Sequence, residues 1–286
     1  MRDEQPLFLK DEIGDMPAAA SLFHVIPVPW EATVSYGGGT ALGPAAILGA
    51  SSQLEVWDGH SIPAEKGIHT TAPVDCSGNP EAVLERIERA TAAALAAHAV
   101  PVLLGGEHTV TLGALRALAA AGPLGVIQFD AHADLRDTYE ESPYSHACVM
   151  HRALDLGLPL FQIGIRSLSP AEVKLRRELS VPGIDGPDLP LAPPREPLLP
   201  SDFPDNVYVT FDVDGLDPSL MPATGTPEPG GLFWHQAMWL LEAIARERNI
   251  VGFDVVELAP IASLHSPQFI CARLTYNLMG MITRNR

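Results

Sequence analysis

The chain has 286 residues, of which 47% are hydrophobic and 19% charged, and its 18 basic and 35 acidic side chains give a formal net charge of −17. This composition supports a sizeable core and excludes intrinsic disorder for most of the chain. The acidic balance argues against a nucleic-acid partner, because phosphates need a basic protein surface. Small cationic ligands remain candidates.

Cysteine usage and the N-terminal sequence bear on location. The three cysteines, Cys76, Cys148 and Cys271, are far apart and show no C-x-x-C spacing, which is typical of a reducing compartment. The first fifteen residues mix acids with one short apolar run, unlike a signal peptide. The longest uncharged apolar stretch, 90–106, is too short and too interrupted to span a bilayer. We therefore expect a cytoplasmic protein with no membrane partner.

Short apolar runs alternate along the chain with segments of helical periodicity. Continuously apolar strands separated by helices indicate a parallel sheet covered on both faces, that is, a three-layer α/β/α fold with a mostly parallel central sheet. The proline-rich segment 182–204 is interpreted as a surface connection, so we expect one domain over 1–286. The predicted strands are 23–26, 102–104, 124–129, 160–165, 207–211 and 250–255, and the predicted helices are one beginning near Pro44, then 81–98, 109–120, 145–156, 234–247 and 266–281.

Three of the predicted strands end in polar clusters that do not suit a core. In such folds ligands bind beyond the carboxyl ends of the strands, so the three clusters are candidates for one site. The clusters are GGEH at 105–108, DAHAD at 130–134 and DVDGLDP at 212–218.

The spacing within two of these clusters predicts a metal site. Alternate residues of an extended chain lie on one face, so Asp130, His132 and Asp134 are expected to converge, as are Asp212 and Asp214. Carboxylates packed in this way repel one another and take up protons unless a cation lies among them. Capping of helices or turns would explain one or two strand-end acids, but not the whole set.

The donor types favour manganese over zinc, because oxygen-rich ligation with one imidazole for each metal suits a fairly hard divalent ion. Six ligands are too many for one such ion and indicate two ions that share bridging carboxylates. A pair of metals lowers the pKa of a shared water and makes it a nucleophile. The motifs therefore predict a hydrolase that needs no serine or cysteine triad.

Several separate motifs, together spanning most of the chain from Pro27 to about Met281, occur in one order. They are TVSY at 33–36, Gly43-Pro44, GGEH at 105–108, DAHAD at 130–134, YSHA at 144–147, DVDGLDP at 212–218, GTPEPGG at 225–231 and DVVELAP at 254–260. This set resembles the ureohydrolase family of arginases and agmatinases, and agmatinases most. The resemblance implies an arginase-like fold.

The resemblance also implies two manganese ions per subunit, with Asp130 and Asp212 bridging them. His108 and Asp134 would complete one ion's ligands, and His132 and Asp214 the other's. All the ligands of the family's site are present: His108, Asp130, His132, Asp134, Asp212 and Asp214. The presence of His132 and Asp214, the ligands of a second ion, argues against histone-deacetylase-like chemistry, which uses a single zinc. Glu107 and Asp217 would orient the metal ligands without binding a metal themselves. Asp217 also suits a turn cap before Pro218.

Further positions match the family's catalytic and substrate residues. Glu257 matches the glutamate that binds the guanidinium, His146 the histidine that moves a proton to the leaving amine, and Thr226 a segment that lines the pocket. A hydroxide shared by the metals and hydrogen-bonded to Asp134 would attack the guanidinium carbon. The alternatives are that Glu257 is an ordinary carboxylate at a strand end and that His146 is an ordinary residue after the N-cap Ser145.

The choice of substrate depends on the residues after DAHAD. Arg136 stands where arginases have an asparagine, so arginine recognition is not expected. GTPEPGG and the acidic chain favour agmatine, cleaved to putrescine and urea, with Glu140 or Glu141 as candidates for its distal amine or as solvated loop charges. Arg136 in the pocket would instead favour a carboxylate end, as in 4-guanidinobutyrate. Aminopropyl-agmatine is a further alternative.

The expected partner is a small cationic guanidino compound. Family members commonly form trimers or hexamers, so the resemblance implies a homotrimer or homohexamer. A non-catalytic metal-binding oligomer is the alternative from another class of protein, and manganese-dependent urea release separates the two.

Overall fold

The computed structural model describes residues 6–286, and the expectations that extend to residues 1–5 lie outside this range. Eight strands form one sheet in the order β2-β1-β3-β8-β7-β4-β5-β6, and every neighbouring pair is parallel. The strands are β1 (Phe23–Val28), β2 (Ile68–Thr70), β3 (Val100–Gly105), β4 (Gly125–Phe129), β5 (Leu160–Ile163), β6 (Gly183–Ile184), β7 (Asn206–Asp212) and β8 (Asn249–Val256).

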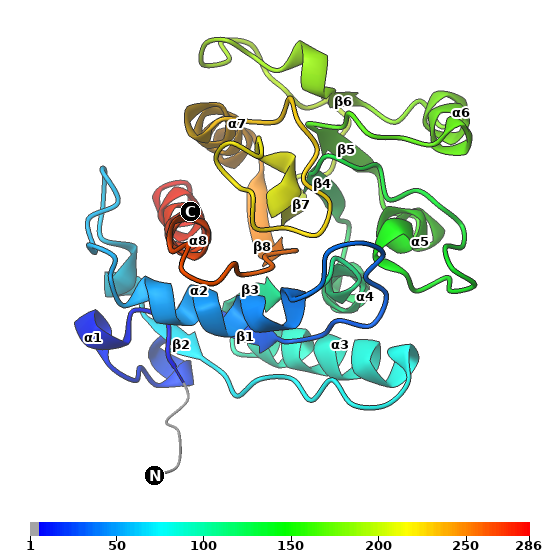
Figure 1. Cartoon of the computed structure of the whole chain (residues 1–286). Coiled ribbons are helices and arrows are strands. Elements are labelled where there is room, and N and C mark those ends of the chain that lie inside the picture. The colour runs from blue at the N-terminus through cyan, green and yellow to red at the C-terminus, as the bar shows by residue number, and fades with distance from the viewer. Residues whose placement is uncertain (1–5) are drawn as a thin grey trace.

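Helices cover both faces of the sheet, which confirms the predicted three-layer α/β/α fold. Buried side chains of α2, α7 and α8 share one hydrophobic core, and those of α3, α4 and α5 share the other. In Figure 1, α7 and α8 lie on one side of the strands and α4 and α5 on the other. The helices are α1 (Lys10–Ile13), α2 (Gly43–Ser51), α3 (Pro80–Ala96), α4 (Val110–Ala121), α5 (Val149–Asp155), α6 (Pro170–Glu178), α7 (Trp234–Glu247) and α8 (Ser266–Arg284).

The central strands are buried on both faces, as their continuous apolar runs predicted. All six residues of β3 and all five of β4 are buried, so each strand supplies side chains to both cores. Within residues 6–286, none of the helices has the length and apolar character that crossing a membrane requires. The segment 182–204 is loop, apart from the short β6 and a 3-10 turn at Gly186–Asp188.

The elements that the sequence did not predict are short or polar. β2 and β6 have three and two residues, and α1 has four, which is too few to establish a period. Helix α6 buries only Glu172, so it has no apolar stripe to find. The predicted helix 145–156 is α5 preceded by a 3-10 turn, His146–Cys148.

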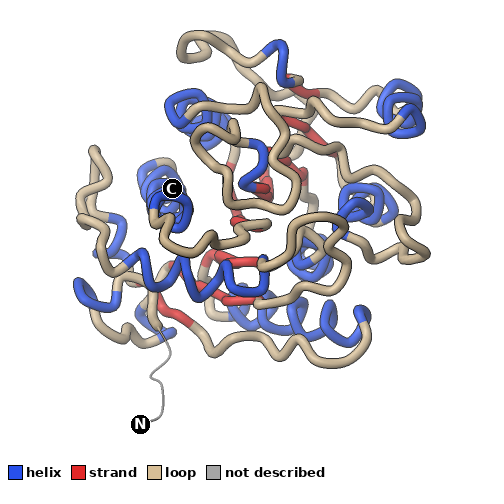
Figure 2. Tube along the Cα trace, viewed as in Figure 1, coloured by secondary structure: helices blue, strands red, loops and turns tan. Residues whose placement is uncertain are grey.

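The strand order positions the site. The neighbouring strands β3, β8, β7 and β4 are parallel, so their carboxyl ends meet at one edge of the sheet. Loops cover this edge, and the strands lie behind them between the two helical layers (Figure 2). The sequence clusters that follow β3, β4 and β7 are therefore brought together.

Candidate metal centre and substrate pocket

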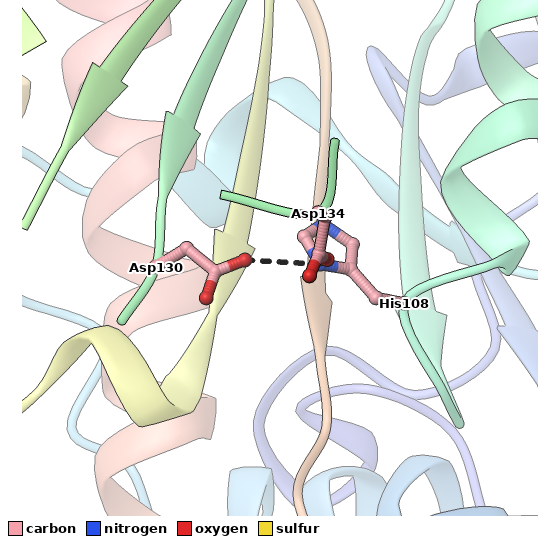
Figure 3. Close-up of side chains that lie close together, drawn as sticks. All are labelled: His108, Asp130 and Asp134. Atoms are coloured by element: carbon pink, nitrogen blue, oxygen red, sulfur yellow. Dashed lines mark ion pairs between the residues drawn. The ribbon is translucent and has the colours of Figure 1, made fainter. Parts of the chain in front are cut away.

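Two groups of histidine and aspartate side chains meet at the carboxyl edge of the sheet. His108, Asp130 and Asp134 form one group, and Asp130, His132 and Asp214 form the other; within each group, one ligand atom per residue lies within 4.8 Å of the others. Asp130 belongs to both groups. Figure 3 shows the first group, in which His108, from the segment after β3, lies close to Asp130 and Asp134, from the segment after β4.

The distances agree with the two predicted ligand sets. His108 Nδ1 lies 2.9 Å from Asp134 Oδ2, 3.2 Å from Asp130 Oδ2 and 3.5 Å from Asp212 Oδ2. His132 Nδ1 lies 2.9 Å from Asp214 Oδ2 and 3.6 Å from Asp130 Oδ1. All six predicted ligands therefore lie together, and the bridging role of Asp212 stays a prediction.

The convergence of DAHAD does not come from an extended strand alone. Asp130 follows the last residue of β4, and the chain then leaves the sheet. Asp134 has a left-handed backbone with φ 52°, which turns its carboxylate toward His108. Its carbonyl accepts hydrogen bonds from the N–H groups of Met150 and His151, so α5 holds this turn in place.

The ring of His108 is oriented by a buried hydrogen-bond chain. His108 Nε2 lies 2.8 Å from Thr210 Oγ1, and Thr210 Oγ1 donates to Asp254 Oδ1 at 2.7 Å. Because the threonine hydroxyl gives its hydrogen to Asp254, it accepts from Nε2–H, which leaves the Nδ1 lone pair for a metal. Nδ1 is buried and faces the carboxylates of Asp134 and Asp130 without a well-aligned hydrogen bond in residues 6–286, which is the arrangement expected of a ligand atom.

The electrostatics of the group also call for a cation. Burial, and then the charges of Asp214 and Asp130, raise the pKa of Asp212 well above its usual range. Burial, and then Asp130, raise the pKa of Asp134 to about 7. The carboxylates therefore ionise together only with positive charge among them. Without a metal the histidines supply part of that charge, since, against the effect of burial, Asp214 and Asp130 raise the pKa of His132 to about 12. Arg136 is the one arginine or lysine that lines the cavity in residues 6–286. One imidazole and several carboxylates for each group suit a hard divalent ion such as manganese.

The groups open into a cavity of about 330 Å³, within the size range of small-molecule sites. Of the predicted residues outside the ligand set, His146, Thr226, Arg136 and Glu257 line this cavity. Glu140 is exposed and is not among its lining residues. Tyr36 and Gly37 also line the cavity, so the loop that precedes α2 is part of its edge.

Glu257 lies immediately after β8 with a left-handed backbone, φ 65°. Its Oε1 accepts a hydrogen bond from His108 N–H at 2.6 Å, which leaves Oε2 for a ligand. Burial, and then the charge of Glu107, raise the pKa of Glu257 well above its usual range, and the His108 N–H opposes this shift. A cationic group in the cavity would restore its charge.

The cavity wall also carries a charged contact. Arg136 lies with its guanidinium 4.8 Å from the centre of the Tyr139 ring, and its Nε is 3.9 Å from Glu172 Oε2. Glu172 is buried, accepts from Ser169 N–H at 2.8 Å, and lines the cavity. Glu172 was not among the predicted site residues, although S-x-x-E at 169–172 is a capping-box signature that indicates a helix start at this position.

Arg166, also missed, connects the loops around the site. Its guanidinium donates to main-chain carbonyls only, with the shortest bonds, 2.7 Å each, going to Asp214 O and Glu228 O. The remaining acceptors are the carbonyls of Gly164, Gly215, Leu216 and Pro229. No local pattern predicts this contact, because Asp214 and Glu228 are 48 and 62 residues away from Arg166.

Glu107 and Asp217, which were expected to orient the metal ligands, form hydrogen bonds with main-chain groups of loops. Glu107 Oε2 accepts from the N–H groups of Ala32 and Thr33, both at 2.7 Å. Asp217 binds a turn, accepting from Ser219 N–H at 3.0 Å and from Gly230 N–H at 3.0 Å. The turn-capping alternative for Asp217 is thus confirmed, and the ligand-orienting role of Glu107 stays a prediction.

An all-parallel three-layer fold with two His/Asp groups that share a carboxylate defines a class of α/β hydrolases with a binuclear metal centre. The chain matches the sequence profile of the Arginase family over residues 21–280. It therefore belongs to the arginase family, whose members are binuclear metalloenzymes, and it is a ureohydrolase. The predicted family resemblance is confirmed.

Individual relatives agree with this assignment. The chain is 38% identical to the "N(1)-aminopropylagmatine ureohydrolase" of Synechocystis sp. over 96% of this chain and 92% of the relative. It is 30% identical to the "Agmatinase" of Pyrococcus horikoshii over 92% of each. The crystal structure of the agmatine ureohydrolase of Thermoplasma volcanium matches with a TM-score of 0.85 and 30% identity, covering 94% of this chain and 92% of that one.

Proposed function

We propose that this chain hydrolyses the guanidino group of a linear guanidino-amine to urea and a free amine, using two manganese ions. The observation that carries this proposal is the pair of ligand groups sharing Asp130 beside a cavity that Glu257 lines. Among the substrates predicted from the sequence, the relatives' names and identities favour N1-aminopropylagmatine over agmatine.

Three cavity side chains, Glu257, Asp134 and His146, have distinct roles in this reaction. Metal ions held by the two groups would lower the pKa of water and stabilise developing negative charge. Glu257 binds the guanidinium through Oε2, since charge-assisted hydrogen bonds favour this pairing. Asp134 accepts a hydrogen bond from the attacking water. As the bond from the guanidinium carbon to the amine nitrogen breaks, His146 gives that nitrogen a proton.

The acidic character of the chain and cavity supports a polycationic substrate. N1-aminopropylagmatine carries two amines beyond its guanidinium, and agmatine carries one. Thr226 Oγ1 lies 3.5 Å from Asp214 Oδ2 and lines the cavity, so it is placed to contact the reacting end of either compound. Glu140 lies on the exposed loop beyond the cavity, where only a long substrate would reach it.

A second candidate substrate is 4-guanidinobutyrate, and the observation that favours it is Arg136. This side chain lines the cavity as a cation, which would pair with a carboxylate end and repel an ammonium. Glu172, 3.9 Å from Arg136 Nε, offsets part of that charge. Replacement of Arg136 by Gln is expected to raise kcat/KM for the amine substrates and to lower it for 4-guanidinobutyrate.

The test is urea release by chelator-washed protein reloaded with manganese, using N1-aminopropylagmatine, agmatine, 4-guanidinobutyrate and arginine in parallel. We expect kcat/KM for N1-aminopropylagmatine to exceed that for agmatine by about tenfold, the effect of ~1.4 kcal/mol from one additional contact. Asp130→Asn should abolish urea release, whereas Asp202→Asn, at an exposed position, is the matched control. Absence of urea from all four compounds would contradict the proposal and favour the non-catalytic oligomer.

Two expectations from the sequence complete the proposal. The homotrimer or homohexamer implied by the family is tested by light scattering of the purified chain. The cytoplasmic location is tested by fractionation of cells that express it.

A further inference from the structure

His146 is fixed in the cavity wall by a residue from a distant loop. His146 N–H donates to Thr33 Oγ1 at 3.0 Å, and the same hydroxyl oxygen lies 3.2 Å from His146 Nδ1. Thr33 Oγ1 in turn donates to Glu107 Oε1 at 3.1 Å. The chain Glu107–Thr33–His146 thus joins a buried carboxylate to the imidazole through one hydroxyl group.

The hydrogen positions in this chain follow from the number of donors. Glu107 accepts at both oxygens, since Oε2 takes the N–H groups of Ala32 and Thr33. The single hydrogen of the Thr33 hydroxyl therefore goes to Oε1, and its lone pairs accept from His146. That assignment places a hydrogen on His146 Nδ1 and leaves the Nε2 lone pair on the other side of the ring. Ser145 Oγ, 3.4 Å from Nδ1, is the more distant neighbour.

We propose that Thr33 is a positioning residue for proton transfer, because its hydroxyl holds His146 in the Nδ1–H tautomer and directs Nε2 into the cavity. This inference rests on the proposed role of His146 in the hydrolase reaction. In the neutral ring Nε2 takes up the proton that the attacking water loses; in the imidazolium it gives that proton to the leaving nitrogen, while the other hydrogen stays on Nδ1, bonded to Thr33 Oγ1 throughout. A ring in the opposite tautomer would present N–H where a lone pair is needed.

The residues on the other sides of His146 do not supply this orientation. The Tyr139 ring meets the imidazole edge-on, with centroids 6.1 Å apart, and the structure records no hydrogen bond between them. The charged or titratable side chains that act on the ring through space are His108, His132 and Asp130. Thr33 is therefore the hydroxyl on which the tautomer depends.

The first test determines the tautomer of His146 directly and does not depend on catalytic activity. Nitrogen-15 NMR of histidine-labelled, metal-free protein, with His146→Asn to assign the signal, reports which ring nitrogen carries the hydrogen. We expect Nδ1–H in the wild type and in Thr33→Ser, which keeps the hydroxyl, and a mixed or Nε2–H population in Thr33→Val. Nε2–H in the wild type would overturn the inference while leaving the proposed hydrolase function intact.

The second test measures kcat and KM separately. Thr33→Val should lower kcat by about 10- to 100-fold, within the ~10²–10⁴ contributed by general acid–base catalysis, with KM within twofold, and Thr33→Ser should restore most of kcat. Thr40→Val is the matched control, because its hydroxyl donates at 2.9 Å to Glu31 in the same loop and does not contact His146. Equal loss in Thr33→Val and Thr33→Ser, or none in either, would contradict the inference. The NMR result decides the matter if Thr33→Val proves unstable.

Discussion

Replacement of Arg166 by Met is expected to loosen the loop that carries Asp214. Arg166 donates from Nη2 to Asp214 O and Glu228 O, both at 2.7 Å, and thereby ties the 214–216 loop to the 225–231 loop. A hydrogen bond from a charged donor contributes ~1.5–3 kcal/mol. Counting only these two bonds, at the lower value because Arg166 is partly exposed, gives a loss of about 3 kcal/mol in the free energy of unfolding.

This loss should appear both in thermal melting and in metal binding. For a chain of this size ~1 kcal/mol corresponds to roughly 2–4 °C, so Tm should fall by about 6–12 °C. Because Asp214 loses its main-chain anchor, affinity at the group of Asp130, His132 and Asp214 should fall by about 10- to 100-fold, as when residues that orient metal ligands are removed.

Differential scanning calorimetry and manganese titration measure the two effects. Arg248→Met is the matched control, since Arg248 also donates to carbonyls, those of Glu247 and Pro200, but far from the ligands. That variant should leave manganese affinity unchanged. A Tm for Arg166→Met within about 2 °C of the wild type, together with unchanged affinity, would refute the reasoning.

Three further results are expected. Asp130→Asn should lower the bound manganese from two ions per chain to fewer than one, measured by elemental analysis, because Asp130 belongs to both ligand groups. Glu257→Gln should lower kcat/KM by about 100-fold, since a charge-assisted pair contributes ~1.5–3 kcal/mol; steady-state kinetics measure this. Burial raises the pKa of Asp134 to about 7, above its unfolded value of ~3.9. Its contribution to stability is therefore present below about pH 4 and lost as the pH rises through 7. Urea unfolding of metal-free protein should show this decline, and added manganese should reverse it.

The sequence was sufficient to predict that the histidine and aspartate side chains converge, because their spacing and their places after the strands are both local. DAHAD and DVDGLDP each follow a strongly apolar run, and parallel strands bring their carboxyl ends to one edge. The turn at Asp134 was not predictable from alternation, because it depends on contacts with α5. Strand and helix positions were likewise predictable wherever a run was long enough to show a period.

The cavity wall was less predictable because distant loops build it. Thr33 contacts His146 across 113 positions of sequence, and Arg166 contacts Glu228 across 62. Hydrogen bonds of this kind leave no periodic signal. Glu172 lies on a polar helix without an apolar face, so hydrophobic periodicity does not predict that helix.

The left-handed backbones of Asp134 and Glu257 imply a conflict between stability and activity. Such conformations cost on the order of 1–3 kcal/mol each in residues other than glycine, and they persist only where the surrounding structure enforces them. Asp134→Gly would relieve that strain and remove a buried acid, so the metal-free variant should melt at a higher temperature than the metal-free parent while losing catalysis. Selection for thermal stability alone would therefore favour replacement of these two residues early. Mutant libraries made to raise thermal stability should keep Asp134 and Glu257 unchanged.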